Sequence, residues 1–391
     1  MARIGGGLAG RSAICHVPGG KHKLAWVEAV GTSSGLIYES SAFGIDAGGA
    51  VGADIVLLAG DVGSNTTGAF APSRALLPLL DGTVLDSLLA RLGATAWSSC
   101  TICANGHTEL LRRSTSLPQG MRLSPRFFAD ASPLGPAGCL HACMPSLHGN
   151  AVFVAGAATW LEEDPAWMLQ QHRANGNALT VYCNNDMNRA LPSGRAVLQH
   201  CGVYCVEREA LNSVRSSGFL DIKEQLIPAL RTAGLRVGAV RVRSAAFPVT
   251  DWSSYMRALT HSCAAQPAPS TAYRREGPSV WTGRNVHVAT SARLMGSVIL
   301  GDDCLIENGA SLIGPIILGS GCHVEEGATL VRVIAPQKTR FDADSFVNDR
   351  FFGTDTGLGA GGSGRPSRAE GTPSSVGMRS SRSLRRCSNA G

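Results

Sequence analysis

The sequence predicts an α/β domain with a mostly parallel sheet, followed by a left-handed β-helix built from hexapeptide repeats. Three observations carry this prediction. Short apolar runs alternate with helical patterns from Ala53 onward, two apolar columns recur every six residues from Val286 onward, and a Pro/Ala/Ser-rich linker at 264–279 separates the two patterns. A chain of 391 residues is long enough for two such domains, each with its own core.

Residues 1–52 form a Gly/Ala-rich extension in which Glu28 is the first acid. An acid-poor, basic start is typical of organelle transit segments, and a plain glycine-rich extension is the alternative interpretation. No apolar run in the chain reaches the ~18 residues that a membrane span needs. We therefore expect a cytoplasmic protein without a membrane span, with a mitochondrial or other organellar location as the alternative.

Residues 53–263 carry the pattern of the α/β domain. Apolar runs with buried-strand character are ADIVLLAG at 53–60, WSSCTICAN at 97–105 and NAVFVAGA at 150–157. Helical patterns are TVLDSLLARLGA at 83–94, GHTELLRR at 106–113 and DPAWMLQQHRANG at 164–176. Because ligands bind beyond the carboxyl ends of parallel strands, we expect a site at the loops after the first and third runs.

Residues 280–335 repeat every six positions, which fits neither a helix nor an ordinary hairpin. One column reads Val286, Ala292, Val298, Cys304, Ala310, Ile316, Cys322, Ala328 and Ile334. The second column reads Val288, Leu294, Leu300, Ile306, Leu312, Leu318, Val324 and Leu330. At ~18 residues per coil, the repeats predict about three coils with both columns pointing inward.

Two further segments follow the repeats. Residues 336–352 contain Phe341, Phe346, Phe351 and Phe352, which could cap the last coil or pack against another chain. Residues 353–391 are a low-complexity Gly/Ser/Arg tail that cannot bury enough apolar surface to fold alone. Much of the net charge of +6 lies in this tail, so the folded part is close to neutral and does not favour nucleic-acid binding. The tail is expected to be solvated or, alternatively, to be a basic arm that orders on an acidic partner.

The twelve cysteines allow two interpretations. Zinc could be held by a set that combines Cys100, Cys103, Cys139 and Cys143 with His107, His141 and His148. The apolar–polar alternation around the first pair instead predicts a buried strand with small core side chains. We expect buried, reduced thiols and no metal site.

Seven segments, in this order, resemble the nucleotide-sugar pyrophosphorylases, a family that includes the mannose-1-phosphate guanylyltransferases and the glucose-1-phosphate nucleotidyltransferases. The segments are ADIVLLAGDVGSN, PSRALLPLLDGTVLDSLLARL, SPLGPAGCL, NAVFVAGAATW, HCGVYCVEREAL, GFLDIKEQLIPAL and DWSSYMRAL. With the repeats, the resemblance spans residues 53–335. It implies a Rossmann-like nucleotidyltransferase domain followed by the β-helix.

The resemblance also implies a reaction and the residues that would bind its nucleotide. In this family a sugar 1-phosphate attacks the α-phosphate of a nucleoside triphosphate, and Mg²⁺ held by two aspartates bridges the reacting phosphates. The nucleotide loop corresponds to Gly60, Gly63 and Ser64, with Asn65 where the family has an arginine. The turn that approaches the base corresponds to Gly135 and Gly138.

The catalytic positions that the resemblance implies are mostly changed. Arg74 stands where the family has a lysine, and it keeps the charge but not the geometry. The first metal aspartate corresponds to Ala157. The second aligns near Pro248, and Asp251 lies three residues later. Arg74 and Asp251 are therefore the degenerate catalytic candidates, and Mg²⁺ is expected only if activity is retained.

Two functions follow. The first is a catalytically degenerate homologue that serves as a structural or regulatory subunit of a larger assembly, as non-catalytic members of this family do. The alternative is an active nucleotidyltransferase that makes a nucleotide sugar such as GDP-mannose. An acyltransferase that uses His287 or His323 on the β-helix is a third, weaker interpretation. Expected partners are proteins or further copies of the chain, bound through the β-helix and the basic tail, and a nucleotide or nucleotide sugar.

Overall fold

A computed structural model describes the main body of the chain and three short strands near its start. The described residues are 52–60, 73–105, 108–115, 124–130, 134–190, 196–213, 218–264 and 272–352, with β1 (Ser12–Ala13), β2 (Cys15–His16) and β3 (Val27–Glu28). β1 pairs with β3, and β2 pairs in parallel with a strand inside the central sheet, at residues 198 and 199. The basic tail expected at 353–391 lies outside the described residues.

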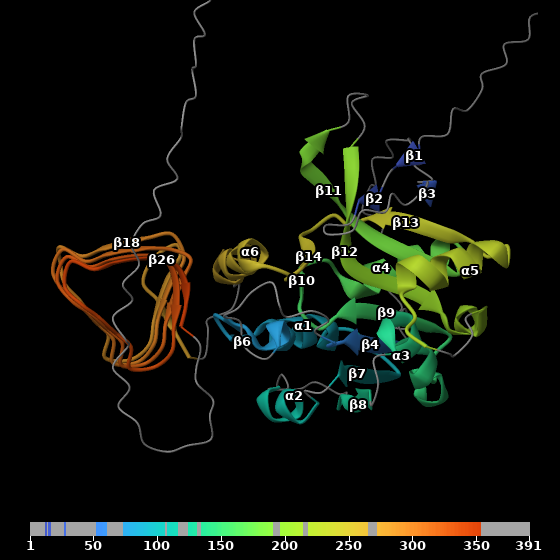
Figure 1. Ribbon diagram of the computed structural model, residues 1–391, viewed down its shortest axis with the longest axis horizontal. Helices are drawn as coiled ribbons and strands as arrows, with labels where there is room; N and C mark the ends of the chain where they lie inside the picture. Colours follow the sequence, from blue (N-terminus) through green and yellow to red (C-terminus); the bar gives the residue numbers. More distant parts are fainter. Residues whose placement is uncertain are drawn as a thin grey trace, which may run out of the picture. The chain divides into compact units, whose positions relative to one another are not determined.

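The α/β region contains a central sheet in which parallel pairing predominates (Figure 1). Its main strands are β4 (Ala53–Leu58), β7 (Ser99–Asn105), β8 (Arg126–Asp130), β9 (Ala151–Gly156), β11 (Leu179–Ala190), β12 (Ala196–Glu207) and β13 (Val237–Arg241). Their spatial order is β13-β11-β12-β9-β4-β7-β8. β12 runs antiparallel to both of its long neighbours, while β4, β7, β8 and β9 are mutually parallel. The prediction of an α/β domain with a mostly parallel sheet is confirmed.

Helices and short ribbons complete this region. The helices are α1 (Val84–Gly93), α2 (Thr108–Ser114), α3 (Gly135–Cys143), α4 (Pro165–Ala174), α5 (Ile227–Thr232) and α6 (Trp252–Ala264). Short helical turns are η2 (Arg74–Leu76), η3 (Met144–Ser146), η4 (Arg208–Ser213) and η5 (Ile222–Leu226). Two small ribbons pair β5 (Pro78–Leu79) with β6 (Gly82–Thr83) and β10 (Thr159–Leu161) with β14 (Ala246–Pro248).

Side chains on the two faces of the sheet form separate cores. One core joins α1 and α4 to the face that includes Ile55 and Phe153. The other joins α3, η5 and α5 to the opposite face, which includes Val56 and Val154. Consecutive strand residues therefore point to opposite cores, as a sheet covered on both faces requires.

The helices predicted at 83–94 and 164–176 are present, and both have capped starts. Thr83 caps α1 in a reciprocal pair with Asp86, and Asp164 caps α4 just before a proline in its first turn. Gly176, after α4, has a φ of +58°, the left-handed conformation that favours glycine. The glycine at the end of α1 is different: Gly93 is its last helical residue, and Ala94 is the C-cap.

The cysteines from Cys100 to Cys322 are free and buried, and the prediction of buried side chains is confirmed for them. Cys100 and Cys103 lie in β7, and Cys139 and Cys143 lie in α3. The Sγ atoms of Cys103 and Cys143 are 3.4 Å apart. Burial raises the pKa of Cys100 to about 12, so this thiol stays protonated at neutral pH.

Residues 272–352 form a stack of short strands that pair in parallel except for the first pair, and Figure 1 shows them as superposed three-sided turns. Its strands are β15 (Arg274–Arg275), β16 (Val280–Thr282), β17 (His287–Val288), β18 (Arg293–Met295), β19 (Val298–Leu300), β20 (Leu305–Ile306), β21 (Ser311–Ile313), β22 (Ile316–Leu318), β23 (His323–Val324), β24 (Thr329–Ala335), β25 (Arg340–Phe341) and β26 (Phe346–Phe351). Val280 pairs with Val298 and Val298 with Ile316, so each partner lies three hexapeptides further along the chain. We call this region the strand stack.

The six-residue register of the strand stack continues to Leu330 and then shifts by one position. Ile317 pairs with Ile334 and His323 with Arg340, so the spacing between partners is one residue less than in the earlier turns. Because the last turn is shorter, Val333 points into the core of the stack. Ile334, predicted to point inward, instead packs in the outer cluster that contains Trp281. The prediction that Ile334 points inward is therefore wrong, because the last turn is one residue shorter than the others.

Residues 336–352 continue the ladders of the strand stack through β25 and β26. Phe341 is buried in its core, and the ring of Phe352 packs edge-on against it at 5.6 Å. Phe346 is 69% exposed. Of the four phenylalanines, two therefore help to close the end of the core, and Phe346 does not.

Among the helices that the structure describes, none is long and apolar enough to cross a membrane.

Candidate functional site

A cleft opens at the carboxyl ends of β4 and β9, where the sequence predicts a site. It consists of two adjoining cavities of about 540 and 150 Å³. Both are lined by Leu58 at the end of β4, Gly156 at the end of β9 and Gly202 of β12. Pro248 and Thr250, at and after the end of β14, also line both cavities, so the two form one continuous cleft.

The smaller cavity holds two of the predicted site residues, Gly60 and Arg74. Ser73 starts η2 by accepting a hydrogen bond from the Ala75 N–H (3.3 Å), which places Arg74 at the cavity. The Arg74 guanidinium donates to the Thr250 carbonyl at 3.0 Å. At Gly60 a Cβ would meet nothing within 4 Å, so a ligand can approach this backbone. Gly63 and Ser64, also predicted to bind nucleotide, lie outside the described residues.

Asp251, the other catalytic candidate, lies in the larger cavity but has a structural partner. Its Oδ1 accepts hydrogen bonds from the Ser254 N–H (2.8 Å) and hydroxyl (2.9 Å). The Ser254 hydroxyl oxygen in turn accepts from the Asp251 N–H at 3.0 Å. This reciprocal arrangement stabilises the start of α6. Arg74 and Asp251 therefore line the same cleft, Arg74 in the smaller cavity and Asp251 in the larger one. Both contact Thr250, which lines both cavities.

Gly135 and Gly138 do not line the cleft, although Pro136 between them does. Gly135 has a φ of +74°, and a Cβ there would lie 2.5 Å from the Leu220 carbonyl oxygen. The Ala137 N–H donates to the same carbonyl at 2.9 Å. These glycines allow α3 to pack closely on the backbone that leads into η5.

The positions expected to bind Mg²⁺ do converge, but the side chains there cannot bind it. Ala157 and Pro248 both line the smaller cavity beside Arg74, and neither has a carboxylate. Nowhere among the described residues do three or more His, Cys, Asp or Glu side chains form a group that could hold a metal ion. The described part of the cleft therefore does not fit the two-aspartate Mg²⁺ site that the family resemblance implies.

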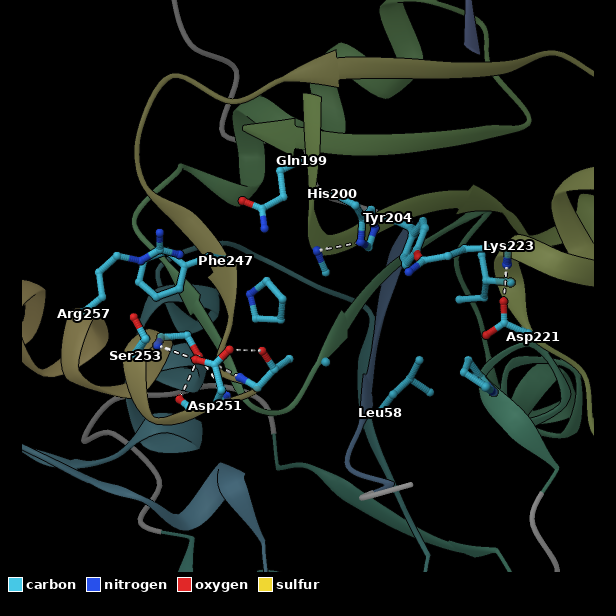
Figure 2. Close-up of a pocket in the computed structure, with 17 residues that line it drawn as sticks. Leu58, Gln199, His200, Tyr204, Asp221, Lys223, Phe247, Asp251, Ser253 and Arg257 are labelled. Atoms are coloured by element: carbon cyan, nitrogen blue, oxygen red, sulfur yellow. Dashed lines mark hydrogen bonds between the residues drawn. The ribbon is translucent and has the colours of Figure 1, made fainter. Parts of the chain in front are cut away.

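Several lining residues of the larger cavity were not predicted from the sequence. His200, Tyr204 and Lys223 lie on one side of it, and Figure 2 shows Asp251 and Arg257 across the opening. Gly202, with a φ of +85°, forms an irregularity in the pairing of β12 that brings His200 to the cavity. The glycine in HCGVYCV was the one sequence signal for this feature.

The His200 imidazole is held in a defined state. The Gly202 N–H donates to Nδ1 at 3.1 Å, and the ring packs on Tyr204 with 4.4 Å between centroids. Burial, together with the positive charge of Lys223, lowers the pKa of His200 to about 3. The imidazole is therefore neutral at physiological pH.

Two charged residues near the cleft have clear structural roles. Asp221 starts η5 by accepting hydrogen bonds from the Lys223 N–H (2.6 Å) and the Glu224 N–H (3.1 Å). Arg257 lies over the Phe247 ring, with 3.5 Å from Cζ to the centroid. Burial lowers the pKa of Arg257, against the opposing effect of Asp251. The cleft thus combines a few cationic groups with largely apolar walls, the usual composition of a small-molecule site.

Comparisons with known proteins give no family assignment. No family model matches the chain, and no curated protein matches it. Among solved structures, the chain is similar to HddC from Yersinia pseudotuberculosis (TM-score 0.44) and to HddC complexed with GMP-PN (TM-score 0.43). Each of these matches has 13% sequence identity and covers 53% of this chain and 97% of that chain. The chemistry of the cleft therefore decides what function can be proposed.

Proposed function

We propose that this protein is a catalytically silent relative of the nucleotide-sugar pyrophosphorylases. It binds a nucleotide or nucleotide sugar in the cleft beyond β4 and β9 without turning it over. Its role is that of a structural or regulatory subunit in a larger assembly.

The observation that carries this proposal is the pair of residues at the two metal positions. Metal-assisted transfer of a nucleotidyl group needs carboxylates that hold the cation between the reacting phosphates. Ala157 and Pro248 occupy the corresponding wall of the smaller cavity, and the carboxylate of Asp251 accepts the hydrogen bonds that start α6. Arg74 and the exposed backbone at Gly60 still suit a phosphate group, since both can supply donors to an anion.

Assembly is supported by the strand stack. Each strand pairs with its equivalent one turn later in three parallel ladders, which supports the interpretation of this region as a left-handed β-helix of hexapeptide repeats. Its outer face at β18, β21, β24 and β26 bears Met295 and Phe346, which are 46% and 69% exposed. Exposed apolar side chains on a regular sheet favour a protein partner or a second copy of the chain.

The alternative is an active nucleotidyltransferase. It is favoured by one observation, namely that Arg74 and Asp251 share the cleft. Activity would then need a cation bound mainly by the nucleotide phosphates.

Two measurements on the full chain distinguish the silent protein from the active enzyme. Pyrophosphate release is followed with each nucleoside triphosphate, a sugar 1-phosphate and Mg²⁺, and thermal stability is followed with the corresponding nucleotide sugars. We expect a rise in Tm with at least one nucleotide sugar, reduced by Arg74→Ala, and no pyrophosphate release. Arg112→Ala, an exposed arginine of α2, is the matched control. Mg²⁺-dependent pyrophosphate release that Arg74→Ala abolishes would overturn the proposal.

The assembly role has its own test. The tagged full chain is purified under native conditions, and its mass in solution is measured by light scattering. A stable complex with other proteins or copies of itself supports the proposal, and we expect Phe346→Ser to weaken it. A monodisperse monomer that recovers no stoichiometric partner would contradict it.

A further inference from the structure

The larger cavity contains a hydrogen-bond donor that the proposed function does not yet use. His200 Nδ1 accepts the Gly202 N–H, so in the neutral imidazole the proton is on Nε2. The Nε2 atom is buried and has no hydrogen-bond partner among the described residues. A buried donor without an acceptor destabilises the protein, because it has lost its bonds to water and gained none in return. An acceptor that arrives with a ligand would remove this cost.

A cation lies close to this donor. Lys223 lines the same side of the cavity, and its positive charge acts on the imidazole strongly enough to help lower the pKa of His200. Figure 2 shows Lys223 and Asp221 on the side of the cavity away from Asp251 and Arg257. Two donors, one of them charged, therefore lie at one end of a cavity of about 540 Å³.

The acids of the cavity do not provide the missing acceptor. Asp221 Oδ1 accepts the two N–H groups at the start of η5, at 2.6 and 3.1 Å. Asp251 Oδ1 accepts from Ser254 at the start of α6. Each carboxylate thus has partners of its own, and neither bonds to His200 among the described residues.

We propose that the end of the larger cavity formed by His200 and Lys223 is an oxyanion subsite, which binds a carboxylate or phosphate group of the ligand. The Nε2–H and the ammonium group donate to its oxygens, at the end of the cleft away from Arg74. This inference rests on the proposed function in that the ligand spans both cavities: one anionic group lies at Arg74, and a second lies at His200 and Lys223. The ligand class is therefore a small molecule with two anionic groups, of which an acidic sugar phosphate is the simplest example.

A matched pair of probes tests this inference. Glucuronic acid 1-phosphate and glucose 1-phosphate differ only in the carboxylate that replaces a CH₂OH group. Binding of each to the full chain is measured by calorimetry at low ionic strength. We expect the acidic sugar to bind roughly tenfold more tightly, because the carboxylate gains charge-assisted hydrogen bonds that the hydroxyl cannot form.

Variants assign the effect to the subsite. Lys223→Met and His200→Phe should both remove the tenfold preference, so that glucuronic acid 1-phosphate binds no more tightly than glucose 1-phosphate. Lys338→Met, an exposed lysine of the strand stack, is the matched control and should keep the preference. His200→Phe replaces a packed ring, so the melting temperature of this variant is measured as well. If His200→Phe unfolds, Lys223→Met alone provides the test.

Inorganic phosphate separates this inference from the function on which it rests. If neither sugar phosphate binds but phosphate shifts the ¹⁵N resonance of His200 Nε2 in a Lys223-dependent way, the subsite is supported; if no nucleotide sugar then raises the Tm, the nucleotide-sugar function is not. Equal affinity for the two sugars, with no response of His200 to phosphate, overturns the subsite and leaves the proposed function intact. Absence of binding by all three probes overturns the subsite, while the Tm response to nucleotide sugars decides the proposed function separately.

Discussion

The strand stack and the α/β region use their residues in different ways. In the stack, each inward position is repeated one turn later by another apolar side chain, as with Leu312 and Leu330, which pair directly. In the α/β region, buried polar groups each have an individual arrangement, such as Asp54, which accepts from Ser99, His148 and Gly149 at 2.6–2.8 Å. Regular repetition gives a uniform core, whereas irregular positions such as Gly202 create cavities and leave donors for a ligand.

The largest effect on stability is expected when a side chain is removed from the repeating core of the strand stack. Leu330 is fully buried, and Leu330→Ala should lower the free energy of unfolding by about 3 kcal/mol through lost burial and a cavity. Met295→Ala, on the outer face of the same ladder, should change it by less than about 0.5 kcal/mol. Urea unfolding of both variants provides the measurement. A similar loss in the two variants would show that the inward column is not a packed core.

A buried carboxylate tests the individual arrangements of the α/β region. Asp54→Ala leaves the N–H groups of His148 and Gly149 without their acceptor, so we expect a loss of about 2 kcal/mol. Ser99→Ala removes one of the three donors and should cost about 1 kcal/mol. Chemical unfolding compares them. The interpretation fails if Ser99→Ala is the more damaging change.

Close backbone contact beside the cleft gives a third test. Gly135→Ala places a Cβ 2.5 Å from the Leu220 carbonyl oxygen at a positive φ, and overpacking of this kind costs about 1–2 kcal/mol. Because Leu220 precedes Asp221, ligand affinity should fall as well. Gly60→Ala, where a Cβ meets nothing within 4 Å, should leave the melting temperature unchanged. Equal melting temperatures for the two variants would contradict the role assigned to α3.

Near neutral pH the smallest expected effect is the pH dependence that His200, a buried imidazole of the α/β region, gives to stability. The pKa of His200 is lowered to about 3 in the folded protein, against an ordinary value of 6.5. The unfolded chain therefore binds the proton first as pH falls, so the contribution to stability is complete above about pH 6.5 and declines toward pH 3. Its slope is at most about 1.4 kcal/mol per pH unit.

His200→Phe should flatten the stability profile between these two pH values, as measured by unfolding at fixed pH steps. His287→Phe is the control, since His287 is exposed in the strand stack. An unchanged slope in His200→Phe would show that the imidazole is not held neutral by its surroundings.

Local sequence patterns predict the regular features of both regions. The strands at 53–60, 97–105 and 150–157 and the N-cap of α4 follow from local patterns, and the α/β fold class follows from the alternation of strands and helices. The position of the cleft was also predicted, because parallel strands bring their carboxyl ends together. Arg74 and Gly60 line this cleft.

Features set by a single residue could not be predicted. The shift after Leu330 depends on one missing residue in the last turn, which does not change the apolar character of Ile334. His200 and Lys223 come from separate strands and turns, and only the irregularity at Gly202 brings the first of them to the cavity. The helix-capping role of Asp251 depends on the Ser254 hydroxyl, which no motif in the sequence indicates.

The shortened last turn of the strand stack also bears on how such a region can change in evolution. Turns before Leu330 share one length, so a whole turn could be duplicated or deleted there without altering which side chains face inward. The turn that ends with β26 has one residue fewer, yet Phe341 and Val347 still pair with the inward residues Val324 and Leu330, so the missing residue is absorbed locally. A sequence period of six residues therefore ends at this turn, although the strand ladders continue through it.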